Sequence, residues 1–143
     1  MATVAQLLGR KPKGIFSVAP DAPVLEAIRV MAEHGVGALL VMQGDKLAGI
    51  LSERDYARKV ILLGRSSSDT PVSQIMTAQV ITVEPTATTQ HCMQIMTDRR
   101  VRHLPVVEGG RVLGMLSIGD LVRAVLAEQA QTIEQLENYI HHG

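Results

Sequence analysis

Two short stretches decide how this chain folds: Gly49-Ile-Leu-Ser-Glu-Arg-Asp55 and Gly114-Met-Leu-Ser-Ile-Gly-Asp120. Both read glycine, two apolar residues, serine, two variable residues and aspartate, and they lie 65 residues apart. At the same offset, residues 17–58 align with residues 82–123 without a gap, and 13 of the 42 positions are identical. The chain therefore contains an internal duplication.

Each repeat predicts the element order β-α-β-β-α. In the first copy, a short apolar strand at 15–18 precedes a helix that begins near Val24 and ends at Gly35. Two runs rich in strand formers follow at 38–42 and 47–51, separated by a hairpin turn. The predicted fold class is α/β (α+β), with two β-α-β-β-α repeats.

The domain boundaries follow from the repeat and from the residues that flank it. Residues 1–62 form the first repeat with an N-terminal leader helix, because residues 4–8 resemble residues 72–76. Residues 63–71 are polar, small and end in proline, which predicts a linker. Residues 72–127 form the second repeat, and residues 128–143 a helical extension.

The overall composition excludes several classes of protein. With 14 basic and 14 acidic residues, the net charge is zero, so we expect no nucleic-acid partner and no attraction to anionic lipid. The single cysteine, Cys92, cannot form an internal disulfide, and the sequence shows neither a signal peptide nor an apolar run that could span a membrane. We expect a cytoplasmic protein.

The Ser-x-x-Asp pattern has two interpretations. A serine followed three residues later by an acidic residue is typical of a capping box, which needs no ligand. Alternatively, the carboxylates of Asp55 and Asp120, each at a helix N-terminus that favours negative charge, could accept both hydroxyls of a ribose diol. In that case Ser52 and Ser117 belong to the same sites.

Cationic residues are unequally divided between the copies. Arg102 and His103 precede a buried strand, where the first copy has Gly37 and Ala38. This pair favours phosphate binding. The neighbouring Arg99 and Arg100 could simply complement the C-terminal dipole of a helix.

A further arginine distinguishes the two closing stretches. Arg54 could pair with phosphate or be an exposed residue of the first helical turn, and the second copy has Gly119 in its place. Phosphate binding at the Asp120 end is therefore expected to be weaker.

The sequence offers no pattern for catalysis or for a metal. The histidines do not show metal-ligand spacing with each other or with Cys92, and no phosphate-binding loop, dinucleotide fingerprint or nucleophile elbow is present. Neither Ser52 nor Ser117 has a histidine placed to activate it. We expect no metal and no enzymatic activity. The histidines considered are His34, His91, His103, His141 and His142.

Taken together, these motifs resemble the cystathionine-β-synthase (CBS) domain family, over about Val4 to Ala127. The resemblance lies in the Val-x-Pro openings, the Leu-Pro-Val-Val run at 104–107 and both Gly-x-x-Ser-x-x-Asp stretches, and it is similar in kind to small free-standing bacterial members. It implies two repeats packed about a pseudo-two-fold axis, as in a Bateman module. It also implies adenine ligands, with AMP favoured over ADP, ATP, NAD(H) or S-adenosylmethionine.

The resemblance further implies two clefts, each of which combines residues of both repeats. One cleft would combine Ser52, Arg54, Asp55, Val80, Ile81, Arg102 and His103. The other would combine Ser117, Asp120, Ile15, Phe16, Gly37 and Ala38. The backbone of the opening strands would then contact the adenine edge.

The C-terminal extension continues an apolar pattern past the repeat. Its spacing alternates four and three residues, which is typical of a heptad. The helix could fold back on its own module or form part of a homodimer, and the resemblance favours the homodimer. The heptad positions are Val122, Leu126, Gln129, Ile133, Leu136 and Ile140.

Two functions remain open at this point. The first is a regulatory module that binds an adenine nucleotide and passes its occupancy, through the dimer, to an unidentified regulated protein. The second is a purely structural dimerisation module in which the Ser-x-x-Asp stretches are only caps. The paired aspartates together with Arg102 and His103 favour the first.

Overall fold

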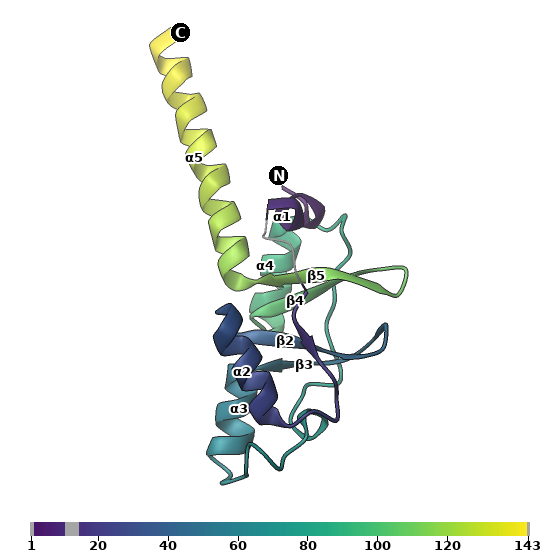
Figure 1. Ribbon diagram of the computed structural model, residues 1–143. Helices are drawn as coiled ribbons and strands as arrows, with labels where there is room; N and C mark the ends of the chain where they lie inside the picture. Colours follow the sequence, from purple (N-terminus) through teal and green to yellow (C-terminus); the bar gives the residue numbers. More distant parts are fainter. Residues whose placement is uncertain (1, 11–14, 143) are drawn as a thin grey trace. The chain divides into compact units, whose positions relative to one another are not determined.

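The computed structural model describes residues 2–10 and 15–142, without the side chains of residues 141 and 142 (Figure 1). The chain forms two compact units. One comprises residues 14–81 and 109–113, and the other residues 1–13, 82–108 and 114–143. Helices and strands occur in both, which confirms the predicted mixed α/β class.

The first repeat forms a three-stranded sheet. Strand β1 (Ser17–Val18) pairs in parallel with β2 (Ala38–Gln43), which pairs antiparallel with β3 (Lys46–Ser52). Helix α2 (Val24–His34) ends at Gly35, whose φ of 62° lies in the left-handed region that glycine adopts without steric cost. The predicted helix stop at Gly35 is confirmed.

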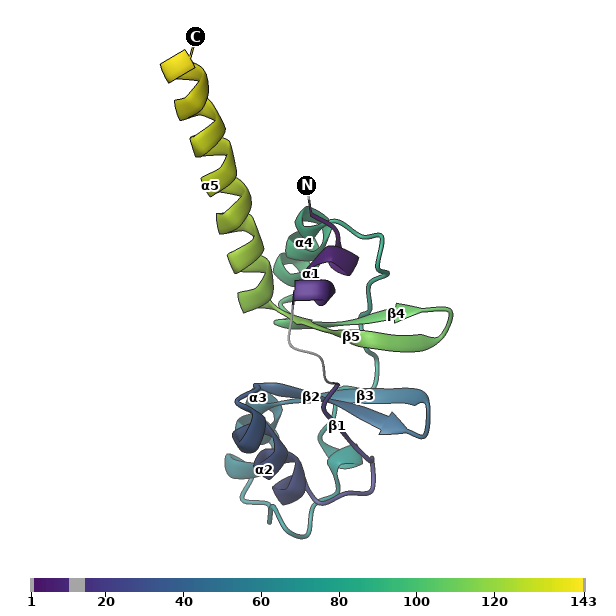
Figure 2. The same cartoon turned by 45° about the horizontal axis from the view of Figure 1, so that its top comes forward.

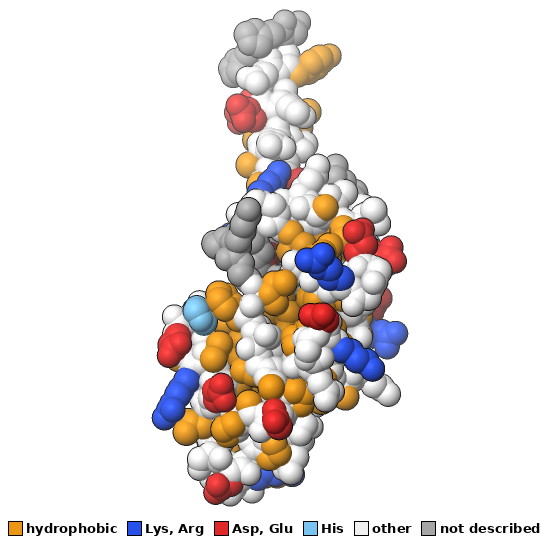
Figure 3. Space-filling model, turned by 45° about the vertical axis from the view of Figure 1, so that its right-hand side comes forward, with side chains coloured by type: hydrophobic (Ala, Val, Ile, Leu, Met, Phe, Trp, Pro, Cys, Tyr) orange, Lys and Arg blue, Asp and Glu red, His pale blue; other side chains and the backbone are white. Residues whose placement is uncertain are grey.

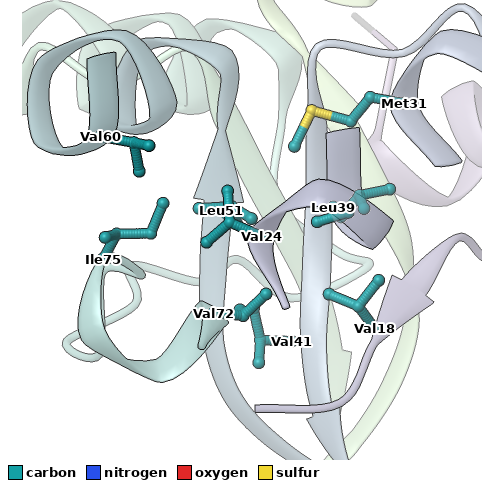
Figure 4. Close-up of a cluster of buried hydrophobic side chains, with 10 residues drawn as sticks. Val18, Val24, Met31, Leu39, Val41, Leu51, Val60, Val72 and Ile75 are labelled. Carbon is teal, nitrogen blue, oxygen red and sulfur yellow. The ribbon is translucent and has the colours of Figure 1, made fainter. Parts of the chain in front are cut away.

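The closing helix of the first repeat changes its winding after one turn. Helix α3 (Glu53–Tyr56) continues as a π-helical segment, η1 (Ala57–Ile61). After the linker, the 3-10 turn η2 (Val72–Gln74) follows. A single buried cluster joins α2, the sheet, η1 and the residues around η2 (Figure 4). It contains Val18, Val24, Ala27, Met31, Leu39, Val41, Leu51, Val60, Val72 and Ile75.

The second repeat forms a hairpin with a helix before it and a helix after it. The strands are β4 (His103–Glu108) and β5 (Arg111–Ser117), and an isolated parallel bridge between Val83 and Val106 stands where the first repeat has β1. Figures 1 and 2 show α5 continuing well beyond α4. The helices of this unit are α1 (Val4–Arg10), α4 (Thr89–Arg99) and α5 (Ile118–His142).

Helix α4 ends in the same left-handed geometry as α2 but without a glycine. Arg100, which aligns with Gly35, has a φ of 55°. A side chain in this region costs roughly 1–2 kcal/mol. Arg100 is therefore a strained helix stop, in addition to the basic helix end that the sequence indicated.

The leader segments lie against the repeats that they do not precede in the chain. In the second unit, the N–H groups of Val4 and Ala5 donate to the carbonyls of Ala87 and Pro85, at 2.8 and 3.0 Å. The sequence had assigned this leader to the first repeat. The difference arises because the leader extends the backbone hydrogen bonding of the segment that precedes α4.

The first repeat is completed in the same way by residues 72–77. The N–H of Val72 donates to the carbonyl of Ala22 at 2.8 Å, and Thr77 exchanges two backbone hydrogen bonds with Ile50, at 2.9 and 3.0 Å. Strand β3 thereby gains a partner on its free edge. The chain is thus duplicated, but each compact unit takes its leader from the other copy.

Within the described residues, no helix is both long enough and apolar enough to cross a membrane.

Candidate functional site

Ser52 caps the closing helix of the first repeat in both directions. The Asp55 N–H donates to Ser52 Oγ at 3.2 Å, and the Ser52 N–H donates to Asp55 Oδ2 at 3.0 Å. Ser52 Oγ also donates to Asp55 Oδ2 at 3.0 Å. The capping box predicted from the sequence is therefore present, and it holds one carboxylate oxygen of Asp55 firmly at the start of the helix.

Ser117 and Asp120 repeat this geometry in the second copy. The Ser117 N–H donates to Asp120 Oδ2 at 2.8 Å, and the Asp120 N–H donates to Ser117 Oγ at 3.2 Å. The Asp120 side chain is 10 % exposed and that of Asp55 17 %. Both carboxylates are thus half-buried and oriented by their own backbone.

The second carboxylate oxygen of each aspartate faces a cation that sequence reasoning missed. Lys59 Nζ lies 3.5 Å from Asp55 Oδ1 and also donates to the carbonyl of Ile75 at 3.0 Å. Arg123 Nη2 donates to Asp120 Oδ1 at 2.7 Å. The signal was present as ordinary helical spacing, four residues in the first case and three in the second.

The residue that precedes the central strand of each repeat bonds to the start of the closing helix. The Glu53 N–H donates to the Gly37 carbonyl at 3.0 Å, and the Ile118 N–H donates to the Arg102 carbonyl at 2.8 Å. One of the free amides of each helix N-terminus is thereby satisfied. Ala38, 1 % exposed, is paired with Ser52 in the β2–β3 register.

The structure therefore groups the predicted residues by repeat. In one unit Gly37, Ala38, Ser52, Arg54 and Asp55 lie at one end of β2 and β3. In the other, Arg102 and His103 lie beside Ser117 and Asp120 through the Ile118 hydrogen bond. The sequence had combined Arg102 and His103 with the Ser52 end, and that combination stays a prediction.

The opening strand of the first repeat contains an aromatic contact that was not foreseen. The Phe16 ring stacks on His34, with centroids 4.0 Å apart and an interplanar angle of 16°. The Phe16 carbonyl accepts from the Leu40 N–H at 3.2 Å, while Ile15 is 47 % exposed. The Phe16 carbonyl is thus already used within the sheet, which leaves its ring and Ile15 as the surfaces available for contact.

Val80 and Ile81 follow the segment that pairs with β3. Both are half-buried and lie three and four residues after Thr77, whose backbone bonds to Ile50. This places the run after Thr77 in the same unit as the Ser52 end. The predicted association of these two residues with Ser52 joins residues of one compact unit.

The glycine of each closing stretch has a packing role. A Cβ built on Gly49 would lie 2.7 Å from Met76 Sδ and 2.8 Å from the Thr77 carbonyl oxygen. A Cβ built on Gly114 would lie 3.0 Å from Leu8 Cδ2. These glycines let the leader segments approach the strand, so the motif positions the capped helix start as well as forming it.

The described residues contain no cluster of three or more His, Cys, Asp or Glu side chains that could hold a metal ion. Cys92 is buried in α4, and desolvation raises the pKa of its thiol above the usual value. The side chains of His141 and His142 lie outside the described part of the chain.

At the N-terminus of each closing helix, an aspartate carboxylate can accept hydrogen bonds and a backbone N–H can donate one. A carboxylate has about four acceptor positions, and the capping bonds occupy one or two of them on Oδ2. The second N–H of each closing helix, that of Arg54 or Gly119, makes no hydrogen bond to another described residue. An oriented carboxylate beside an outward amide suits a ligand that carries both hydroxyl donors and an anionic group.

Comparisons with known proteins agree on one family. The CBS domain model matches residues 11–61 and 72–127. A structure of a protein with CBS domains from Burkholderia ambifaria MC40-6 has a TM-score of 0.86 at 54% identity, and the match covers 90% of this chain and 96% of that one. The CBS domain protein PAE2072 from Pyrobaculum aerophilum, complexed with AMP, has a TM-score of 0.78 at 26% identity, with 91% and 99% covered.

A curated relative extends the similarity to plants. The CBS domain-containing protein CBSX3, mitochondrial, of Arabidopsis thaliana is 47% identical over 128 residues. The match covers 86% of this chain and 62% of the Arabidopsis protein.

Proposed function

The chain belongs to the CBS domain family, and on this premise we propose that it is a regulatory module that binds an adenine nucleotide at its two Ser-x-x-Asp ends. The observation that carries the proposal is the duplicated geometry of Asp55 and Asp120. In both copies the cap orients the carboxylate through Oδ2 and leaves Oδ1 on the side away from the cap.

Ribose is the part of the ligand that this geometry suits best. Its 2′ and 3′ hydroxyls are adjacent donors, and an oriented carboxylate accepts both, as an acidic residue does in dinucleotide-binding folds. The cation beside Oδ1 would have to move or share that oxygen. Lys59 and Arg123 can do so because the Lys59 side chain is 42% exposed and that of Arg123 72%.

AMP is the ligand that we favour. The structural relative PAE2072, at 26% identity, is complexed with AMP in its solved structure, which supports an adenine nucleotide here. ADP, ATP, NAD(H) and S-adenosylmethionine stay as alternatives. We keep the assignment from the sequence, in which Ser52, Arg54, Asp55, Val80 and Ile81 act with Arg102 and His103.

For the Asp120 end we also propose the residues predicted from the sequence. It would use Ser117 and Asp120 with Ile15, Phe16, Gly37 and Ala38. The stacked Phe16 ring and the exposed Ile15 offer apolar surface for a base. We further propose that the protein acts without catalysis, in the cytoplasm.

We propose that occupancy is passed on through a homodimer. The C-terminal half of α5 exposes apolar side chains at heptad spacing, and Figure 3 shows hydrophobic side chains along this part of the helix. Ile133, Leu136 and Ile140 are 57%, 59% and 74% exposed. An exposed apolar stripe of this kind favours pairing with a second copy.

A structural dimerisation module without a ligand is the second candidate. It is favoured by the completeness of both capping boxes, because capping alone accounts for the serine and aspartate positions. It does not account for the cations held at both Oδ1 atoms. The two candidates differ in whether the purified chain binds nucleotide.

Calorimetric titration of the full chain with AMP, ATP, NADH and S-adenosylmethionine separates these candidates. Asp55→Ala and Asp120→Ala should each weaken binding at their own end by roughly 1.5–3 kcal/mol, the range for hydrogen bonds to charged groups. If the parent binds AMP and the two single variants and the double variant bind it equally well, the aspartates are caps only and the proposed binding at the Ser-x-x-Asp ends is wrong. If the parent binds none of the four ligands, the structural candidate is favoured.

A matched control removes a cap that lies elsewhere. Thr88 Oγ1 accepts from the His91 N–H at 3.1 Å at the start of α4. Thr88→Ala should cost about 1 kcal/mol of folding free energy, as cap removal does, and leave nucleotide affinity unchanged. A loss of affinity in this control would show that lost stability, and not lost recognition, explains the aspartate variants.

A further inference from the structure

The Arg123 guanidinium lies beside the backbone of Gly119 in the second Gly-x-x-Ser-x-x-Asp stretch. In the alignment of the repeats, Gly119 stands where the first copy has Arg54. A Cβ built on Gly119 would lie 3.4 Å from Arg123 Nη1 and 3.6 Å from Ser117 Oγ. The guanidinium therefore lies over the backbone of Gly119, where a side chain at that position would begin.

The guanidinium keeps donors available in this position. It makes one hydrogen bond, from Nη2 to Asp120 Oδ1 at 2.7 Å, and no other to a described residue. A guanidinium has five N–H donors in a planar fork. With 72% of the Arg123 side chain exposed, the remaining donors face solvent. The N–H of Gly119 makes no hydrogen bond to another described residue either.

Helix stability does not explain this arrangement. An exposed ion pair three residues apart on a helix contributes only a few tenths of a kcal/mol. The helix dipole also disfavours a cation near the N-terminus. Asp120 therefore holds the guanidinium where it contributes little to the stability of the fold. An incoming anion would be bound at the same helix N-terminus.

The first repeat shows that this arrangement is particular to the second. Arg58 aligns with Arg123, yet it makes no hydrogen bond or ion pair to a described residue. There Asp55 faces Lys59, which is also bonded to the Ile75 carbonyl. With Arg54 present, the first end has its own candidate for phosphate binding, and Arg58 is not drawn toward the aspartate.

We propose that Arg123 is the phosphate-binding residue of the Asp120 end, in the role proposed for Arg54 at the Asp55 end. This rests on the proposed nucleotide-binding function. When a nucleoside 5′-phosphate binds, the ribose hydroxyls take Asp120 Oδ1 and the released guanidinium pairs with the phosphate. The charges of Asp120 and Arg123 are both compensated before and after the exchange. Because Gly119 stands in place of Arg54, the sequence predicts weak phosphate binding at this end. Arg123 would supply the missing cation.

The test isolates the second end in an Asp55→Ala background of the full chain. AMP and adenosine are titrated by calorimetry into this protein and into the same protein with Arg123→Ala, Arg123→Lys or the matched control Arg58→Ala. We expect Arg123→Ala to weaken AMP at least tenfold and to leave adenosine unchanged or slightly tighter, because Asp120 loses a competitor. Arg123→Lys should fall between, and Arg58→Ala should change neither ligand. Melting temperatures of all variants check folding.

The outcomes separate this inference from the proposed function. If AMP and adenosine bind the Asp55→Ala protein and Arg123→Ala leaves AMP unchanged or weakens both ligands equally, Arg123 does not bind phosphate, while the proposed function stands. If AMP binds the parent but not the Asp55→Ala protein, the second end is no phosphate site and the inference is again wrong. If the parent binds neither ligand, the proposed function fails and the inference fails with it.

Discussion

Gly49 and Thr77 lie so close together that a Cβ built on Gly49 would come within 2.8 Å of the Thr77 carbonyl oxygen. The contact exists because Thr77 pairs with Ile50 along the edge of β3. It joins the leader of the second copy to the closing stretch of the first. The glycine of that stretch is therefore required by packing, one strand residue away from the bonded edge.

Gly49→Ala should destabilise the fold by roughly 1–3 kcal/mol, as overpacking in a close-fitting core does. The clash is with backbone and cannot be relieved by a rotamer change. Urea denaturation measures the effect. Gly114→Ala should cost less, because its 3.0 Å contact is with the end of the Leu8 side chain.

Gly9→Ala is the control for this prediction. A Cβ at Gly9 meets nothing within 4 Å, and the residue lies in α1, so alanine there should be neutral or stabilising by up to about 1 kcal/mol. An equal loss of stability at Gly9 and Gly49 would contradict the packing explanation.

Arg100→Gly should stabilise the protein by roughly 0.5–1 kcal/mol, because Arg100 adopts a φ of 55° that glycine adopts without strain. The aligned exchange Gly35→Ala should destabilise it by about the same amount. Thermal and urea denaturation of both variants check the pair. Opposite signs are expected, and a loss of stability in Arg100→Gly would show that the arginine side chain contributes more than its backbone costs.

Arg102→Ala should weaken AMP binding at least tenfold while it changes adenosine binding little, because a charge-assisted bond to phosphate is lost. The helix start should survive, since Ile118 bonds to the backbone carbonyl of Arg102 and not to its side chain. Arg99→Ala, at the last position of α4, is the matched control and should alter neither ligand. Equal losses for AMP and adenosine would assign Arg102 a structural role.

Ile133→Glu together with Ile140→Glu should weaken the homodimer that we propose, because it places charge on the exposed apolar stripe of α5. Each repeat should remain folded, since both positions lie beyond the duplicated region. Gln131→Glu together with Asn138→Glu adds the same charge to another face of the same helix and should leave the dimer intact. Sedimentation with and without saturating AMP measures assembly and its linkage to binding.

Separate results would contradict the proposed coupling between AMP binding and dimerisation. If the parent is monomeric with and without AMP, no homodimer transmits occupancy. If the dimer constant and the hydrogen exchange of α5 are both unchanged by AMP, the proposed transmission is wrong even where binding is observed.

Local patterns were enough to predict much of the fold. The stop at Gly35, the capped starts at Ser52 and Ser117 and the β-β hairpins depend on residues close together in the chain. The exchange of leaders was not predictable in this way, because the bonds of Val4 to Ala87 and of Thr77 to Ile50 join distant segments of similar sequence. Similar leaders give the alignment no means to decide which repeat each one completes.

For the candidate site, too, the local sequence pattern was enough to predict some residues but not others. The aspartates were found because a duplicated Ser-x-x-Asp pattern is visible in the sequence. The pairing of Arg123 with Asp120 Oδ1 was missed because Arg58 and Arg123 are aligned and identical, yet only Arg123 pairs with the aspartate of its own repeat. The second copy has no side chain at Gly119, and Arg123 Nη1 lies 3.4 Å from where its Cβ would stand, a proximity that residue identity alone does not reveal.

Ribose recognition by Asp55 and Asp120 is tested most directly by a double-mutant cycle between protein and ligand. AMP and 2′-deoxy-AMP are titrated into the parent and into the variant that carries both Asp55→Asn and Asp120→Asn. The parent should prefer AMP by about tenfold or more, the factor that corresponds to one hydrogen bond to a charged group. In the variant this preference should fall toward one. A preference of the same size in both proteins would show that the aspartates do not accept the ribose hydroxyls, and would contradict the account.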